Sequence, residues 1–227
     1  MAKNVSPKKV SLVVLISGDG SNLQAIIDAI NHHQLDAEIK TVISNRPEAP
    51  GLRRAIKDNI TTHVINHKEY PTRQAFDQAM IKIIDPLKPD LIILAGFMRI
   101  LSEHFIDHYQ NRLINIHPSL LPKYKGLNTH QQALDNKDIT HGSSVHFVSH
   151  ELDSGPVVIQ AKIDIHHTDN AKDLAARVLE IEHKIYPLTI QLFAQNRIKF
   201  NGNQVLFDNK PLKKPLLWKN EQITNNN

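Results

Sequence analysis

The 227-residue sequence contains no cysteine, few aromatic residues and no long apolar run. Without cysteine the chain cannot form a disulfide, a thiolate metal site or a cysteine nucleophile. The longest apolar runs, at residues 12–16 and 91–95, are far shorter than the roughly 20 residues that span a bilayer. The first residues also lack the apolar segment of a secretory signal peptide. These absences predict a cytoplasmic protein without a membrane partner.

Charge and aromatic content argue against a nucleic-acid partner. The net charge is only +4, and aromatic residues make up 5% of the chain. A nucleic-acid-binding surface typically combines a concentrated basic face with aromatic side chains on which bases stack. The lysines here are spread along the sequence, apart from a cluster near the C-terminus formed by Lys210, Lys213, Lys214 and Lys219. The mild positive balance fits a small anionic substrate better.

Apolar periodicity predicts strands and helices in alternation. A β-branched run at residues 10–16 predicts a buried strand, and Leu23, Ile26 and Ile30 follow it at helical spacing. Further strands are expected at residues 39–44, 63–65, 91–95, 112–116, 143–148 and 156–165. Helical stripes are expected at residues 52–56, 76–87, 131–134 and 174–192, the last with a kink at Pro187. This order predicts an α/β fold with three layers, a mostly parallel twisted sheet covered by helices on both faces.

The domain organisation predicted from this pattern is simple. No internal repeat and no linker divides the sequence, so we expect residues 1–227 to form one domain. The tail after about residue 210 is expected to be peripheral, and residues 225–227 are expected to be frayed.

The turn after the first predicted strand is a candidate anion site. Gly20, Ser21 and Asn22 lie where the backbone N–H groups of a helix N-terminus can bind a phosphate. A dinucleotide fingerprint would require a third glycine, where Leu23 stands, and an acidic residue after the second strand, and both are absent. A P-loop is also absent, because no Gly-Lys-Ser/Thr follows. Two interpretations remain: a site for a single phosphate, or a tight turn capped by Ser21 or Asn22.

A second constellation lies on the fifth predicted strand and in a later loop. Asn115 and His117 are two residues apart near a strand end, so their side chains point the same way, and Asp153 follows another strand before Gly155. Together an amide, an imidazole and a carboxylate can protonate and stabilise an oxyanion without a covalent nucleophile. A carboxylate beside an imidazole favours the charged ring. The structural alternative is a buried histidine and a turn-forming aspartate.

Other histidines carry weaker signals. His104 and His108 have the i,i+4 spacing of a metal-binding pair, but no third ligand is evident, so a solvated helix face is the better interpretation and no metal is expected. His146 shares its alternation with Ser144, so it either lines the site or packs in the core.

Several segments together resemble a known family. Residues 16–24, 94–101, 115–122 and 151–156, with Glu182 and His183, are similar to the glycinamide ribonucleotide formyltransferases, folate-dependent enzymes of purine biosynthesis. The resemblance covers nearly the whole chain. It implies a formyltransferase fold with a Rossmann-like N-terminal half that binds phosphate and a C-terminal half that binds folate.

The resemblance also implies an activity and a set of site residues. The formyl group of 10-formyltetrahydrofolate, a cosubstrate, would pass directly to the amine of glycinamide ribonucleotide, without a metal. Catalytic roles fall on Asn115, His117 and Asp153, and substrate contacts on Gly20, Ser21, Asn22 and Glu182. The implied folate contacts are Arg73, Met98, Arg99, Ile100, Leu101, Asn115, Ser149, His150, Glu151, Leu152 and Asp153. Leu179 departs from the polar residue that relatives can carry, and a homodimer remains open.

Three alternatives stay open on the sequence. A formyltetrahydrofolate hydrolase would share the three catalytic residues, but would add an N-terminal regulatory domain and would need no phosphate turn. A methionyl-tRNA formyltransferase would need a further C-terminal domain, for which too few residues follow Phe193. A non-catalytic nucleotide-binding module would bind phosphate compounds without transferring a formyl group.

Overall fold

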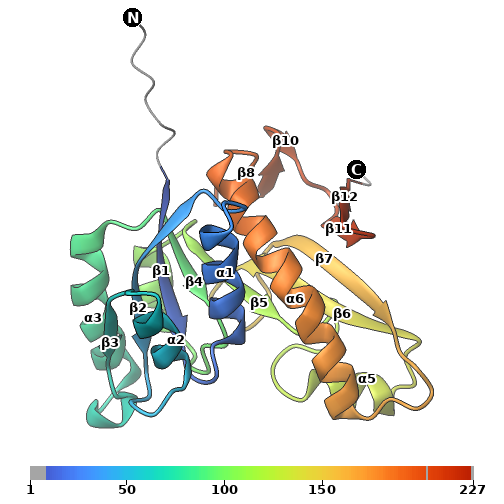
Figure 1. Ribbon diagram of the computed structural model, residues 1–227, viewed down its shortest axis with the longest axis horizontal. Helices are drawn as coiled ribbons and strands as arrows, with labels where there is room; N and C mark the ends of the chain where they lie inside the picture. Colours follow the sequence, from blue (N-terminus) through green and yellow to red (C-terminus); the bar gives the residue numbers. More distant parts are fainter. Residues whose placement is uncertain (1–8, 203, 226–227) are drawn as a thin grey trace, which may run out of the picture.

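The computed structural model describes residues 9–202 and 204–225. Within these residues a nine-stranded sheet has the order β12-β11-β7-β6-β5-β4-β1-β2-β3 (Figure 1). The strands are β1 (Val10–Ile16), β2 (Ala37–Ser44), β3 (Thr62–Val64), β4 (Leu91–Leu94), β5 (Leu113–His117), β6 (Thr140–Phe147), β7 (Val157–Asp164), β11 (Leu216–Lys219) and β12 (Gln222–Thr224). The neighbouring strands β3, β2, β1, β4 and β5 all pair in parallel. Strand β6 is antiparallel to both β5 and β7.

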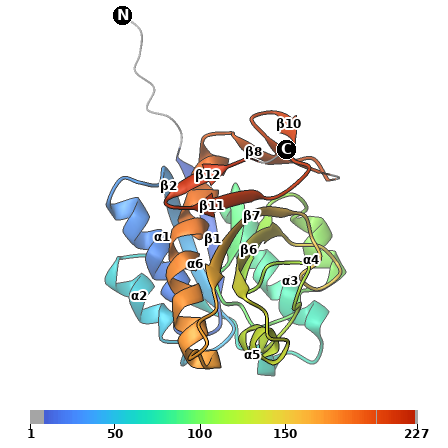
Figure 2. The same cartoon turned by 90° about the vertical axis from the view of Figure 1, so that its right-hand side faces the viewer.

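Helices cover both faces of this sheet (Figure 2). One face carries α1 (Ser21–Asn31), α2 (Gly51–Lys57) and α6 (Ala171–Ala194), and the other carries α3 (Arg73–Ile84) and α4 (Glu103–His108). The remaining helices are α5 (Thr129–Asp135) and the short 3-10 turns η1 (His67–Glu69) and η2 (Asp85–Leu87). The predicted three-layer α/β fold with a mostly parallel sheet is confirmed.

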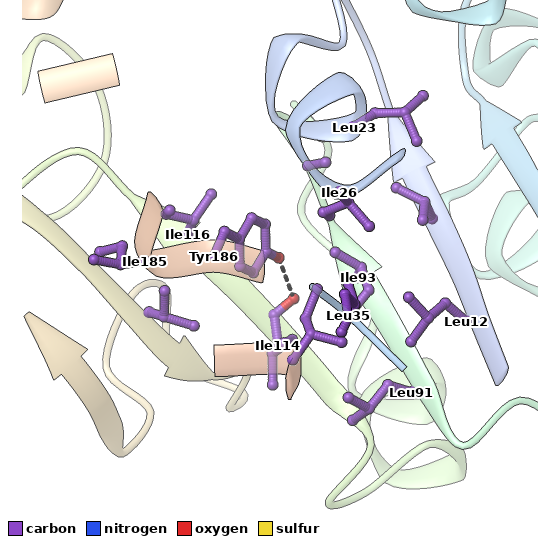
Figure 3. Packing of buried hydrophobic residues seen from close by; sticks show 14 of the residues in the cluster. Leu12, Leu23, Ile26, Leu35, Leu91, Ile93, Ile114, Ile116, Ile185 and Tyr186 are labelled. Carbon is purple, nitrogen blue, oxygen red and sulfur yellow. Dashed lines mark hydrogen bonds between the residues drawn. The ribbon is translucent and has the colours of Figure 1, made fainter. Parts of the chain in front are cut away.

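The alternation of side chains along β1 shows how two cores arise from one strand. Leu12 and Val14 pack with α1 and α6, whereas Val13 and Leu15 pack with α3 and α4. All seven residues of β1 are buried, because a central parallel strand is covered on both sides. Tyr186 of α6 reaches into the first core and donates its hydroxyl to the carbonyl of Ile114 on β5 (Figure 3).

The long helix α6 begins at a capping motif and contains Pro187, where a kink stays a prediction. Asn170 caps it, accepting from the N–H groups of Lys172 and Asp173, and Asp173 returns a contact to the Asn170 N–H in a capping box. The helix runs through Pro187 to Ala194, so the proline does not end it.

The chain after α6 contains paired strands that the sequence does not predict. Strands β8 (Ile198–Phe200), β9 (Val205–Phe207) and β10 (Lys210–Pro211) form a small second sheet that we did not anticipate. β11 then pairs in parallel with β7, and Leu216 is fully buried. The segment after residue 210 therefore lies at the sheet edge but is part of the main sheet. Residues 226 and 227, expected to be frayed, lie outside the described residues.

The sheet order brings the candidate residues to one edge. β1 lies between β2 and β4. The connection after β1 runs to β2 and the connection after β4 runs to β5 on the opposite side, so the turns after β1 and β4 flank a topological switch point. β5, which carries Asn115 and His117, is the next strand along. In open parallel sheets ligands bind outside the C-terminal ends of the strands at such a point. Among the described residues no helix is long and apolar enough to cross a membrane.

Candidate active site

The turn after β1 is shaped by backbone geometry. Gly20 precedes α1 with a φ of 74°, and a Cβ built on it would lie 2.7 Å from the Cα of Gly51. Gly51 in turn donates its N–H to the carbonyl of Gly18 at 3.0 Å. No side chain among the described residues caps the N-terminus of α1, so the interpretation of Ser21 or Asn22 as a helix cap is wrong. The first N–H groups of α1 therefore remain without a side-chain acceptor, as an anion site requires.

Asn22 and Glu182 join this turn to α6. The Asn22 amide donates to a Glu182 carboxylate oxygen at 2.8 Å, although 160 residues separate them. Ser143 of β6 contacts the other carboxylate oxygen at 3.1 Å and the backbone carbonyl of His117 at 2.8 Å. The Ser143 hydroxyl has only one hydrogen for these two acceptors. If Glu182 is protonated, its carboxyl group donates to the Ser143 oxygen, and the Ser143 hydrogen is free for the His117 carbonyl. Burial raises the pKa of Glu182, which favours that protonated form.

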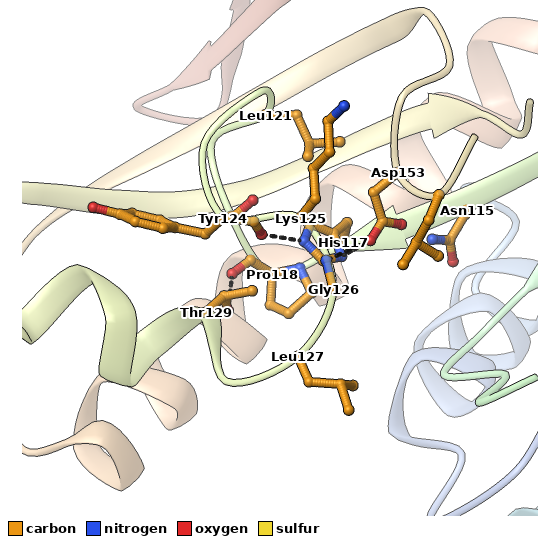
Figure 4. A network of polar contacts seen from close by, with 12 residues as sticks. Asn115, His117, Pro118, Leu121, Tyr124, Lys125, Gly126, Leu127, Thr129 and Asp153 are labelled. Atoms are coloured by element: carbon orange, nitrogen blue, oxygen red, sulfur yellow. Dashed lines mark hydrogen bonds and ion pairs between the residues drawn. The ribbon is translucent and has the colours of Figure 1, made fainter.

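The predicted catalytic residues meet at the end of β5 (Figure 4). His117 Nδ1 lies 3.4 Å from an Asp153 carboxylate oxygen, and both side chains are almost completely buried. Asn115 lies two residues before His117 on β5, and its amide contacts His146 of the neighbouring strand at 3.2 Å. The structure thus brings the amide, the imidazole and the carboxylate together, whereas their catalytic roles remain predictions.

Both ring nitrogens of His117 face acceptors. Nε2 donates to the backbone carbonyl of Tyr124 at 2.8 Å, since a carbonyl can only accept. Nδ1 faces the carboxylate of Asp153 at 3.4 Å. Because Tyr124 accepts from Nε2, donation to a substrate oxygen from that atom requires the Tyr124 contact to be exchanged.

Asp153 owes its position to an unusual backbone. Its φ is 48°, in the left-handed region that aspartate tolerates better than most residues. Its carboxylate accepts the N–H of Gly126 at 2.9 Å, which ties the loop of residues 118–128 to the loop of residues 149–155. A Cβ on Gly155 would lie 1.8 Å from the carbonyl oxygen of Phe147, so only glycine allows this close return of the chain.

The predicted folate segment after β4 is held in place by buried polar groups. The hydroxyl of Ser17 accepts the N–H of Met98 at 2.7 Å, and Asp77 of α3 accepts the N–H of Ser102 at 2.6 Å. Burial raises the pKa of Asp77, while the contact with Ser102 and the charges of Arg73 and Arg99 lower it. The positive charges of Arg73 and Arg99 therefore act on the Asp77 carboxylate.

The remaining predicted folate residues lie on the loop that carries Asp153. His150 contacts Asp107 of α4 at 2.7 Å, and Ser149 donates to the carbonyl of Glu151 at 3.1 Å. Lys125 pairs with Glu151 at 3.0 Å and lowers its pKa. Four large apolar side chains near these loops are exposed: Met98, Ile100, Leu127 and Leu152. An exposed apolar surface beside buried polar groups is typical of a small-molecule site.

Two residues that contact the site carry no signal in the sequence. Ser143 has no sequence signal, because its contact with Glu182 depends on where α6 crosses the sheet. Tyr124 takes part through its backbone carbonyl, which no side-chain pattern reveals. For His146, the sequence allows a place at the site or in the core, and in the structure it lies at the site, with Nε2 3.7 Å from an Asp153 carboxylate oxygen.

A metal centre finds no support in the part of the chain that the structure describes, where no three His, Asp or Glu side chains are grouped to hold an ion. His108, one of the two histidines with metal-like spacing, instead contacts the carboxylate of Asp85 at 2.9 Å.

Comparisons with known proteins agree with this geometry. A family model described as Formyl transferase matches residues 10–190. Phosphoribosylglycinamide formyltransferase of Escherichia coli (strain K12) is 51% identical over 203 residues, covering 89% of this chain and 96% of that protein. The solved structure of phosphoribosylglycinamide formyltransferase from Coxiella burnetii is 51% identical with a TM-score of 0.86, covering 90% of this chain and 96% of that one.

A second solved structure extends the likeness to lower identity. Glycinamide ribonucleotide transformylase 1 from Symbiobacterium toebii is 37% identical with a TM-score of 0.87, covering 91% of this chain and 98% of that one. The matches span the turn after β1, the segment after β4, and β5 with its partners, which are the parts that build the site. The chain therefore belongs to the formyl transferase family, among the phosphoribosylglycinamide formyltransferases.

Proposed function

We propose that the chain transfers the formyl group of 10-formyltetrahydrofolate directly to the amine of glycinamide ribonucleotide, giving the N-formyl product and tetrahydrofolate, a step of purine biosynthesis. The observation that carries this proposal is the group at the end of β5, formed by the half-buried Asn115 and the buried His117 and Asp153, beside an uncapped helix N-terminus. The side-chain group at the end of β5 suits the reacting carbonyl, and the uncapped helix N-terminus suits the phosphate of the formyl acceptor.

The three polar groups have distinct roles in this reaction. As the amine adds to the formyl carbon, negative charge develops on the formyl oxygen, and the Asn115 amide and the protonated His117 ring can donate to it. Asp153 faces Nδ1 of His117 and stabilises the charged ring. A site water carries the amine proton to N10 of the folate as the bond between N10 and the formyl carbon breaks, which releases tetrahydrofolate. The chain needs no covalent nucleophile for this sequence of steps.

The ribonucleotide is assigned to the turn after β1. Gly20, Ser21 and Asn22 present the first N–H groups of α1 to the phosphate, and the α1 dipole adds favourable potential there. We assign to Glu182, which accepts a hydrogen bond from Asn22, the contact with a sugar hydroxyl. Leu179 offers no polar contact from the same helix.

The folate is assigned to the loops of residues 96–102 and 149–153. Met98 and Ile100 are more than half exposed, and an aromatic ring system would cover such apolar side chains. Arg73 and Arg99, whose charges also act on Asp77, supply positive charge for the carboxylates of the folate. We extend the proposal to one domain over residues 1–227, a cytoplasmic location, small-molecule partners and a homodimer.

One assay tests the proposed activity against its closest alternative. The purified protein is incubated with 10-formyltetrahydrofolate, with and without glycinamide ribonucleotide, and loss of the formyl folate is followed. We expect loss only when the ribonucleotide is present. Equal loss without it would indicate a hydrolase, and no loss in either mixture would exclude the enzyme and favour a binding module.

A further inference from the structure

His146 is a buried histidine that the proposed reaction does not yet use. It lies on β6 directly opposite Asn115 of β5, so the two side chains share one face of the antiparallel pair. The pairing of β6 with β7 changes register between Val145 and His146. Such irregularities re-aim side chains beside active sites. His146 is 2% exposed and therefore cannot turn away from its neighbours without leaving the core.

The hydrogen bonds of His146 assign its protons. Nδ1 lies 2.9 Å from the carbonyl oxygen of Phe147, and because a carbonyl only accepts, Nδ1 must carry a hydrogen. Burial lowers the pKa of the ring, so it is neutral and Nε2 keeps its lone pair. Two charged groups face the ring, Asp153 at 3.7 Å from Nε2 and the His117 ring beyond it.

That lone pair decides the orientation of the Asn115 amide. The Asn115 nitrogen lies 3.2 Å from Nε2 of His146 and donates one of its two N–H groups to it. If the amide were turned over, its oxygen would face the lone pair and repel it. A neutral ring with this tautomer therefore selects one of the two amide orientations.

We propose that His146 is a positioning residue, which holds the Asn115 amide so that its second N–H can donate to the reacting oxygen. This inference rests on the proposed formyl transfer, because it assigns His146 a part in the same site. His146 does not touch the reacting atoms in this scheme. Without it Asn115 can present its oxygen, which repels the developing negative charge, as easily as its N–H.

A pair of substitutions separates this role from simple packing. His146→Phe keeps an aromatic ring but removes the acceptor, whereas His146→Gln keeps an oxygen that can accept from Asn115. We expect His146→Phe to lower kcat on the order of 10- to 100-fold with little change in KM. We expect His146→Gln to recover most of that loss. Equal loss in both variants at equal thermal stability would overturn the positioning role.

A double substitution shows whether His146 acts through Asn115. In an Asn115→Ala background, where there is no amide to orient, His146→Phe should change kcat less than about threefold. A further loss as large as in the wild-type background would mean that His146 acts on another group, and Asp153 is the nearest.

A spectroscopic measurement tests the tautomer independently of activity. In ¹⁵N NMR of the wild-type protein near neutral pH, the His146 ring should show a protonated Nδ1 and an unprotonated Nε2. A protonated Nε2 would contradict the inference even if the enzyme is active. Conversely, a wild-type protein without formyl transfer but with the expected tautomer would reject the proposed function and leave the orientation of Asn115 intact.

Discussion

The two parts of the site are built in different ways. At the turn after β1, the proposed binding groups are backbone N–H groups placed by Gly20, whose positive φ and close approach to Gly51 leave no room for a side chain. At the end of β5, the proposed catalytic groups are side chains from this strand and from a distant loop, where Asp153 has a left-handed backbone and Gly155 allows a close return of the chain. A local turn forms the first part, and long-range packing forms the second. Substitutions should therefore affect the two parts differently.

The largest expected effect is on the side-chain part. Asp153→Asn keeps the left-handed backbone tolerance and an acceptor for the Gly126 N–H, but it removes the charge that favours the protonated His117 ring. We expect kcat to fall by about 10²-fold or more, with KM for the ribonucleotide nearly unchanged. A near-normal kcat would contradict the role of Asp153.

A smaller effect is expected on the backbone part. Gly20→Ala places a Cβ against Gly51 and forces a non-glycine residue into the left-handed region. We expect KM for the ribonucleotide to rise about tenfold and the free energy of unfolding to fall by about 1–2 kcal/mol, with kcat retained at saturation. Gly18→Ala, whose Cβ would meet nothing within 4 Å, is the stability control. An unchanged KM in Gly20→Ala would show that the phosphate does not bind at this turn.

Glu182→Gln tests the group that joins the two parts. The pKa of Glu182 is raised by burial, so the folded chain holds this proton more tightly than the unfolded chain. Stability is then lost as the pH rises through the folded pKa, and a neutral glutamine avoids that loss. We expect KM for the ribonucleotide to rise several-fold, roughly as for one lost hydrogen bond. In urea unfolding at pH 8 the variant should be the more stable protein, and a less stable variant would show that the carboxylate is needed in its charged form.

A last expected effect is on stability rather than on activity and concerns a histidine pair beside the site. His141 is buried, contacts His130 at 3.2 Å, and has a pKa lowered to about 4, chiefly by burial. Because the unfolded chain binds this proton more readily, stability should fall as the pH drops from about 6.5 to about 4, by at most about 3 kcal/mol. His141→Gln should flatten that dependence in urea unfolding at successive pH values. An equally steep dependence in the variant would assign the acid sensitivity to other groups.

The sequence predicted much of the backbone part because its signals are local. The run at residues 10–16 is the observed strand β1, and the helix follows Gly20 as expected. The choice between a cap and an anion site was not local, because it depended on whether Ser21 or Asn22 turned back onto the helix. The structure shows that Asn22 instead reaches Glu182 on a helix far along the chain.

The order of the last strands could not be predicted for a related reason. Residues 198–224 form short segments with mixed polarity, and their strand character comes from pairing partners rather than from periodicity. β11 is a strand because it pairs with the edge of β7, and this pairing makes Leu216 a core residue. A few residues do not encode the sheet edge with which a strand pairs.

By itself the sequence determined which residue types meet the chemistry: an amide and an imidazole two apart on one strand, a carboxylate before a glycine, and a glycine turn before a helix. Periodicity and glycine placement are properties of neighbouring residues, so they can be read along the chain. Tertiary structure alone decided the distances, the left-handed backbone of Asp153, and the contact of His146 with Asn115. Those features depend on the burial and pairing of strands, which bring together residues that the chain keeps apart.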